Sequence, residues 1–315
     1  MEAPNIFVDG TGKLRSGWRA VLFAVAFLVC AKLFEAIAFI VIGFAGRDRA
    51  VALSRSSWSF LIGALVLLSS ATLVGWACGR IFEDLPFRSF GWSPHSGWFK
   101  NLMIGSAIGA ASLFLAAGLA AVTRGIRFSL DSVDASTILK TAIVSALIFI
   151  VAASGEEALF RGYPLQTFAR AKLAWVGVLL TSLPFAMAHL YNPHANRGFT
   201  FVNTALAGVW LAAAYLRTRS LWFPLGLHWS WNWAQASLLG LPVSGIERIA
   251  PAPLLHAMNA GPDWLTGGAY GIEGGAACTV ALVISTVVVW RTRFVSPTET
   301  LPESPSSVAP SASNQ

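Results

Sequence analysis

Residues 143–166 read IVSALIFIVAASGEEALFRGYPLQ, an apolar stretch that ends in two adjacent glutamates and an arginine. Residues 143–163, which include these charged side chains, are long enough to cross the roughly 30 Å hydrocarbon core of a bilayer as a helix. Ionisable side chains cost about 2.5–3.5 kcal/mol each on insertion scales, so they are rare in spanning segments and usually mark a site. The stretch therefore predicts a membrane-spanning helix with a polar site near its end.

The whole chain has the composition of a polytopic membrane protein. Of its 315 residues, 55% are hydrophobic and 12% are charged, and the mean hydropathy is +0.63. Soluble domains rarely combine these values. An all-α fold with about eight transmembrane helices is predicted from apolar stretches at residues 18–43, 59–78, 102–122, 143–163, 173–190, 201–216, 222–239 and 278–290.

Composition also divides the chain. Residues 1–16 are expected to form a cytoplasmic segment and residues 17–293 the membrane domain. Residues 294–315 are rich in Pro and Ser with almost no apolar content, which predicts a disordered tail. Glycines and prolines are dense in residues 240–275, so tight turns are expected there and not a further helix. The three cysteines lie in apolar segments without CxxC spacing, which argues against disulfides or a thiolate metal site.

The net charge of +7 does not indicate nucleic-acid binding, because the basic residues lie at the ends of apolar segments and not on one face. More of them fall on the cytoplasmic side when the N-terminus is placed inside. The first apolar run is too long for a cleavable signal peptide and contains Lys32 and Glu35, one turn apart and expected to neutralise each other. We therefore predict a multi-pass protein of the cell (inner) membrane with both termini in the cytoplasm.

The first polar motif is Glu156-Glu157-x-x-x-Arg161. Glu157 and Arg161 are four residues apart, so on a helix they share a face and are expected to form an ion pair. Glu156 lies about 100° further round the helix by the 3.6-residue period, which leaves it without this partner. A free carboxylate in such a place is a candidate general base.

Two later apolar segments each carry another polar pair. Phe185 and His189 lie one turn apart in PFAMAH, residues 184–189, where the aromatic ring is expected to hold the imidazole by packing. His228 and Asn232 are spaced four apart in LHWSWN, residues 227–232, so both side chains face one cavity. An imidazole beside a carboxamide supplies hydrogen-bond donors of the kind that stabilise an oxyanion.

In this order, EExxxR, FxxxH and HxxxN resemble the motifs of the CAAX protease and bacteriocin-processing (CPBP) family of intramembrane proteases, also called the Abi family. The stretch TGGAYGIEGG at residues 266–275 is similar to bacterial members as well. The resemblance implies an eight-helix fold around a polar intramembrane cavity, with a protease core at about residues 139–240. It also implies hydrolysis of a peptide bond in a membrane-associated peptide or protein substrate.

The same resemblance implies roles for the motif residues. Glu156 with His189 would activate the attacking water, and His228 with Asn232 would bind the oxyanion. No Ser or Cys lies beside a base in the motifs, so direct attack by water is expected and not a covalent intermediate.

The other motif residues are expected to support this arrangement. The resemblance implies that Glu157 with Arg161 fixes the geometry of the site, and Phe185 is expected to support the second motif. A buried Glu157–Arg161 pair that only fixes helix register is the simpler alternative.

The family is often labelled metalloprotease, and the sequence leaves the need for a metal open. No HExxH is present to supply two zinc ligands from one helical face. If zinc is used, Glu156, His189 and His228 are the expected ligands. The same groups also suit water activation without a metal, which we slightly favour.

Two further hypotheses stay open. A non-catalytic membrane scaffold or immunity-type binding protein would keep the fold, and a small transporter would use the buried Glu and His as a proton relay. The full motif set favours the endopeptidase, and no inverted repeat is evident to support a transporter. One condition applies to every model with a shared site: Glu156 and His189 reach the same depth only if their spans begin late, near Ser145 and Val178.

Overall fold

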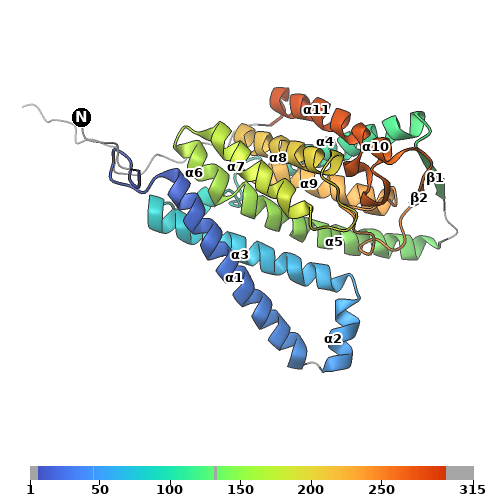
Figure 1. Cartoon of the computed structure of the whole chain (residues 1–315), viewed down its shortest axis with the longest axis horizontal. Helices are drawn as coiled ribbons and strands as arrows, with labels where there is room; N and C mark the ends of the chain where they lie inside the picture. Colours follow the sequence, from blue (N-terminus) through green and yellow to red (C-terminus); the bar gives the residue numbers. More distant parts are fainter. Residues whose placement is uncertain (1–5, 45, 131–132, 296–315) are drawn as a thin grey trace, which may run out of the picture.

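The computed structural model describes residues 6–44, 46–130 and 133–295. It is a bundle of long helices, with one helical hairpin that diverges from the rest (Figure 1). The helices are α1 (Ser16–Phe44), α2 (Arg47–Ser54), α3 (Trp58–Glu83), α4 (Trp98–Val122), α5 (Ala135–Phe160), α6 (Tyr163–Arg170), α7 (Ala174–His189), α8 (Phe199–Thr218), α9 (Trp222–Trp233), α10 (Asp263–Thr266) and α11 (Ala276–Arg291).

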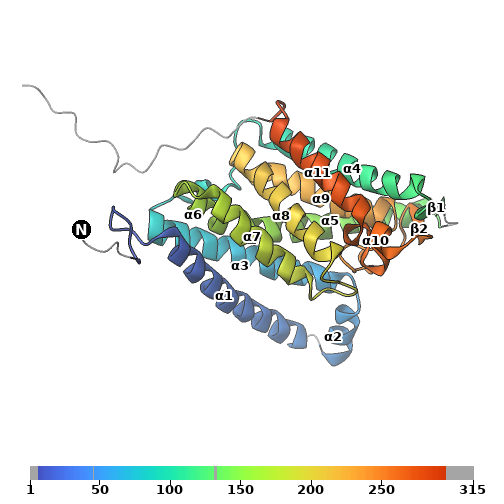
Figure 2. The ribbon, with the colours of Figure 1, turned by 45° about the horizontal axis from the view of Figure 1, so that its top comes forward.

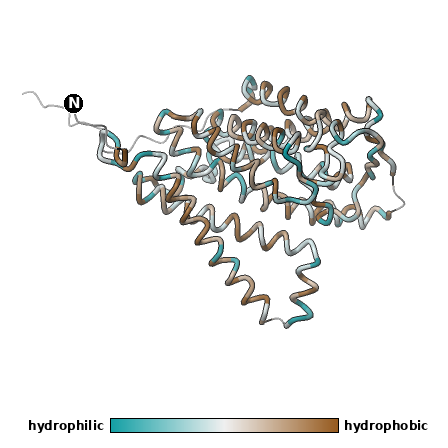
Figure 3. The backbone as a smooth tube through the Cα atoms, viewed as in Figure 1, coloured by the Kyte–Doolittle hydropathy of each residue, from teal (hydrophilic) through white to brown (hydrophobic). Residues whose placement is uncertain are grey.

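Each of the eight predicted spans overlaps a helix. Most of the length of these helices is hydrophobic (brown in Figure 3). Five helical stretches of the described chain are long and apolar enough to cross a membrane: α1, α3, α4, α8 and the joined α5–α6 stretch Ala135–Arg170. Helices α7 and α11 are shorter apolar helices. The protein is therefore an all-α polytopic membrane protein, while the count of eight spans and the orientation stay predictions. Residues 296–315, most of the expected tail, lie outside the described residues.

The helix that carries the first motif begins earlier than expected. The side chain of Asp134 caps α5 by accepting a hydrogen bond from the Thr137 backbone N–H at 3.0 Å, so the helix begins at Ala135 and not near Ser145. Hydrogen bonds from Ser136 and Thr137 lower the pKa of Asp134 to about 2. Helix α5 therefore includes the residues before Ser145, while the depth at which its span enters the bilayer stays a prediction.

The second motif helix, α7, begins at Ala174, and the start of its span near Val178 stays a prediction. Helix α7 runs back along α5 after the turn through α6 (Figures 1 and 2). The Phe185 ring packs against Phe160 at 5.2 Å between centroids. His189, one turn further along α7, therefore returns toward the level of Glu156, one turn back along α5.

Close packing fixes the helix that carries the third motif. Helices α4 and α9 meet at glycines: a Cβ at Gly105 would collide with the Phe223 carbonyl oxygen, and one at Gly109 with that of Leu227. The largest hydrophobic cluster of the described residues lies around this contact and includes Trp210 of α8. Helix α9 is thus held against α4 before any polar contact is considered.

The long connection between α9 and α11 contains a strand that the sequence did not predict. Strand β2 (Leu255–Asn259) pairs antiparallel with β1 (Ile126–Leu130), which follows α4, with Ile126 opposite Asn259. The backbone N–H groups of Ala260 and Gly261 also donate to the Gly125 carbonyl oxygen. The rest of the connection contains the expected turns, but also short helices that were not expected, among them α10 and η4 (Ile272–Gly274).

Helix α1 contacts the bundle through its first half, where its buried residues are Ser16, Arg19 and Phe23. Lys32 and Glu35 form the expected ion pair at 2.7 Å on the exposed part of the helix. From there α1 diverges from α3, and α2 closes the far end of the hairpin (Figure 1).

A buried cluster of charges anchors α1 to α3 and α6. The Glu83 carboxylate accepts from Arg19 at 2.8 Å and from Arg170 at 2.9 and 2.7 Å. The Glu83 and Arg19 side chains are less than 10% exposed. Removing one partner of such a cluster leaves an uncompensated buried charge.

Replacing Glu83 with Gln is expected to lower the free energy of unfolding by about 3 kcal/mol, because Arg19 would lose its buried counter-charge. Unfolding of the purified protein in detergent measures this change. Asp84→Asn is the matched control: it removes an exposed pair with Arg80 and should cost less than about 1 kcal/mol. Equal effects of the two changes would show that the cluster does not anchor α1.

Candidate active site

The Glu157 carboxylate of α5 is shared by two side chains. Its Oε1 atom accepts from Arg161 Nη1 at 3.2 Å and lies 2.8 Å from His228 Nδ1 of α9. The expected ion pair between Glu157 and Arg161 is therefore present, and both side chains are fully buried. Because a carboxylate only accepts hydrogen bonds, His228 Nδ1 carries a proton, and its Nε2 atom points away from Glu157.

Arg161 extends this contact to two more helices. Its Nη2 atom donates to the Gly208 carbonyl oxygen of α8 at 3.1 Å, and its guanidinium lies 4.6 Å from the centroid of the Phe185 ring of α7. Gly208 allows α7 and α8 to approach closely, since a Cβ there would come within 2.7 Å of Ser182. One arginine thus connects α5, α7 and α8.

Glu156 lies on the other side of His228. Its Oε2 atom is 3.6 Å from His228 Nε2 and is buried without a hydrogen-bond partner among the described residues. His228 therefore stands between two carboxylates. A proton on Nε2 would face Glu156, because Nε2 is the ring nitrogen that Glu157 leaves free.

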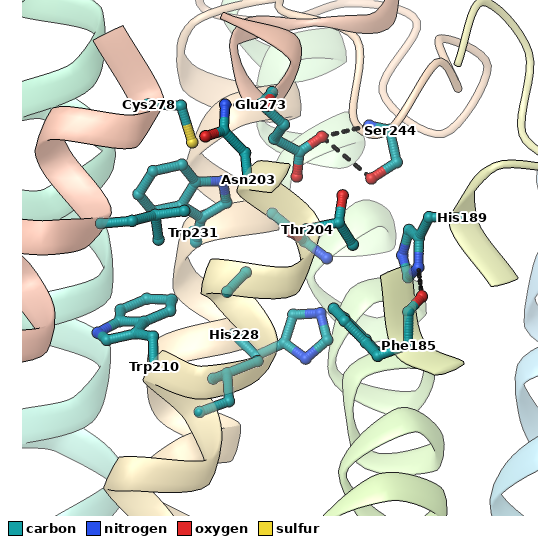
Figure 4. A pocket seen from close by; sticks show the side chains of 14 residues that line it. Phe185, His189, Asn203, Thr204, Trp210, His228, Trp231, Ser244, Glu273 and Cys278 are labelled. Carbon is teal, nitrogen blue, oxygen red and sulfur yellow. Dashed lines mark hydrogen bonds between the residues drawn. The ribbon is translucent and has the colours of Figure 1, made fainter. Parts of the chain in front are cut away.

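A cavity of about 50 Å³ lies beside these residues, between α7, α8, α9, α11 and the long connection. Four predicted site residues line it: Phe185, His189, His228 and Asn232, the first three labelled in Figure 4. This volume holds a few water molecules, but not a peptide segment. The His189 Nδ1 atom lies 2.8 Å from the Phe185 carbonyl oxygen and so donates to it. The lone pair of His189 is consequently on Nε2.

The predicted residues thus fall into two groups that meet at His228. Glu156, Glu157 and Arg161 do not line the cavity, and no hydrogen bond or ion pair joins Glu156 to His189 in the described structure. The Phe185 ring lies 4.5 Å from the His189 ring and 6.2 Å from the His228 ring, between centroids. Phe185 therefore contacts both imidazoles as well as Arg161.

The structure adds a carboxylate that the motif analysis missed. Glu273 of η4 lines the cavity, and its Oε2 atom accepts from the backbone N–H and the hydroxyl of Ser244 (Figure 4). Burial raises the pKa of Glu273 above its usual value, and this is opposed by the Ser244 hydrogen bonds and by His189 when its imidazole is protonated. The available signal was a lone acidic residue in the glycine-rich stretch 266–275.

The described residues do not form a metal site. They contain no group of three or more His, Cys, Asp or Glu side chains that could hold a metal ion. Glu156, His189 and His228, the expected zinc ligands, do not converge: both Nδ1 atoms are engaged elsewhere, and Glu156 is outside the cavity that His189 lines. The donor set as arranged does not fit zinc.

Comparison with known proteins shows which family the motif region is similar to. Residues 137–234 match the family of type II CAAX prenyl endopeptidase Rce1-like proteins. This Rce1-like region contains all three motifs, which confirms the resemblance to CPBP proteases and supports a CAAX-type protease at the family level. Over 97 residues the chain is 37% identical to an Escherichia coli protein described as an uncharacterized 24.3 kDa protein; the match covers 30% of this chain and 41% of that protein. No solved structure matches.

Replacing Arg161 with Lys is expected to destabilise the Rce1-like region by about 2 kcal/mol. Lysine keeps the charge, but it cannot bond both Glu157 and the Gly208 carbonyl oxygen while stacking on Phe185. Unfolding in detergent gives the loss. Arg80→Lys, at an exposed pair, is the control and should change stability by less than about 0.5 kcal/mol. An unchanged Arg161→Lys variant would contradict the connecting role of the guanidinium.

Proposed function

We propose that this protein is an intramembrane endopeptidase of the CAAX protease type, which hydrolyses a peptide bond of a membrane-associated substrate by direct attack of water. One observation carries the proposal: His228, fixed by Glu157, contacts Glu156 and lines a water-sized cavity together with His189 and Asn232. A base, hydrogen-bond donors and room for water thus occur together within apolar helices.

Water activation is assigned to Glu156, assisted by His189. The Glu156 Oε2 atom has no hydrogen-bond partner in the described structure, so it is available to accept a proton from water. The lone pair of His189 Nε2 faces a cavity large enough for that water. Glu156 does not line the cavity in the structure described, so this assignment requires its carboxylate to turn past His228 toward a water molecule held by His189 when substrate binds.

The oxyanion is assigned to His228 and Asn232. Both line the cavity, and Glu157 holds the His228 ring in one orientation from behind. With a proton on Nε2, His228 is a donor, and the Asn232 carboxamide supplies a second one. Donors that are fixed before the reaction stabilise the charge of a tetrahedral intermediate without having to reorient.

The substrate is proposed to approach from the bilayer, since the family description names prenyl CAAX substrates and lipid would hold such a chain end at the membrane. The cavity is too small for a peptide in the structure described. Side chains that line it have to move when a substrate binds, and the apolar ones, such as Trp210 and Leu282, are not tied to the catalytic groups by any hydrogen bond in the described structure.

The test is cleavage of membrane-associated peptides, including farnesylated CAAX-type peptides, by the purified protein. Glu156→Gln is expected to lower kcat about 100-fold or more through loss of the base, and His228→Ala by a similar factor through loss of an oxyanion donor. Glu35→Gln, on the exposed part of α1, is the matched control and should leave cleavage unchanged. Unfolding in detergent identifies any variant that loses activity through misfolding.

Addition of a zinc chelator is expected to leave cleavage unchanged, because the described donor set does not fit zinc. A loss that added zinc restores would overturn the metal-free step. If the wild-type protein cleaves none of the peptides, and the Glu156 and His228 variants still support its cellular role, the scaffold hypothesis replaces the endopeptidase.

A further inference from the structure

Glu273 lies outside the Rce1-like region, yet it reaches the same cavity as the motif residues. It comes from the connection between α9 and α11 and lies near Asn203 and Ser244 (Figure 4). Glu156, in contrast, contacts His228 from outside the cavity lining. The lining of the cavity therefore includes a carboxyl group that is separate from the proposed base.

The position of Glu273 is fixed by several contacts. Asn203 of α8 donates to the carbonyl oxygens of Glu273 and Gly275, both at 2.8 Å, and accepts from the Thr279 hydroxyl at 2.6 Å. Gly271, at φ +102°, passes so close to the Pro242 carbonyl oxygen that a Cβ there would collide with it. These contacts hold the backbone of η4, and Ser244 holds the carboxyl group itself.

A structural role alone does not explain this carboxyl group. No Lys or Arg within the described residues forms an ion pair with Glu273, unlike Glu83 and Glu157, which each pair with arginine. Buried carboxylates that serve structure are usually paired. Burial also raises the pKa of Glu273, which favours a neutral carboxylic acid with a proton to donate.

We propose that Glu273 is a further catalytic residue, the general acid that protonates the leaving amine. This inference rests on the proposed endopeptidase function. Ser244 bonds one carboxyl oxygen, Oε2, so the other is assigned to carry the proton. Glu273 lines the same cavity as His228 and Asn232, so a leaving nitrogen beside these oxyanion donors enters a space that the Glu273 carboxyl group also lines.

The proton balance is complete without a further reactant. Water attacks the carbonyl carbon and gives one proton to Glu156. This attack forms the C–O bond and turns the carbonyl oxygen into the oxyanion. The C–N bond then breaks as the nitrogen takes the proton of Glu273, which becomes a carboxylate. The proton on Glu156 returns to Glu273 through water, so the net reaction is a peptide plus water giving an acid and an amine.

A pair of substrates that differ only in the leaving group tests the role. One is a membrane-associated peptide that the wild-type protein cleaves, and the other has a thioester in place of the scissile amide. A thiolate leaves without prior protonation, since thiols have pKa values near 8.5, whereas an amine does not. Glu273→Gln is expected to lower kcat on the amide about 100-fold and on the thioester by less than about threefold.

Glu247→Gln is the control, because it makes the same change at an exposed position of the same connection. It should leave both rates unchanged, and Glu273→Gln should unfold in detergent at the same midpoint as the wild type. If Glu273→Gln cleaves the amide at the wild-type rate, or loses both activities equally, the general-acid role is overturned. If the wild-type protein cleaves neither substrate, the proposed function falls, and this role falls with it.

Discussion

The site depends on the Glu157 carboxylate, which is fully buried and shared by Arg161 and His228. A buried charge is costly unless an opposite charge and hydrogen bonds compensate it. Arg161 supplies the opposite charge. It also binds α8 by a hydrogen bond to the Gly208 carbonyl oxygen and α7 by its contact with the Phe185 ring. Four helices are therefore held in one relative position by a single connected group.

This arrangement explains how the two walls of the cavity differ. One wall, here called the motif wall, consists of Phe185 and His189 of α7 and His228 and Asn232 of α9. The Glu157 contacts and the close packing of α4 on α9 at glycines hold this wall in place. The opposite wall comes from a connection that is held by hydrogen bonds from Asn203 and by the β1–β2 pairing. The hydrogen-bond donors on one side and the separately held Glu273 carboxyl group on the other suit the proposed reaction. In it, one group takes a proton from water and a different group gives a proton to the leaving nitrogen.

Contacts within one helix were predictable from the sequence, and contacts between helices were not. The 3.6-residue period gives the Glu157–Arg161, Phe185–His189 and Lys32–Glu35 neighbours, all of which are present.

No such rule relates α5 to α9, so the contact of Glu157 with His228 was missed, and Glu156 was paired with His189, which it does not touch. Glu273 lies in a segment without periodicity and reaches the cavity only through long-range contacts with Asn203 and Ser244. Sequence patterns therefore located the motif wall but not the wall that faces it.

Charge balance links these observations to the proposed chemistry. In a low-dielectric environment the two adjacent carboxylates, Glu156 and Glu157, cannot both stay uncompensated, and Arg161 neutralises one of them. A second proton on the His228 ring would neutralise the other, because His228 Nε2 lies 3.6 Å from Glu156 Oε2. When this proton is on His228, Glu156 is free to accept a proton from water and His228 can donate to an oxyanion. The arrangement that makes the buried group electrically neutral is thus also the one that the proposed hydrolysis requires.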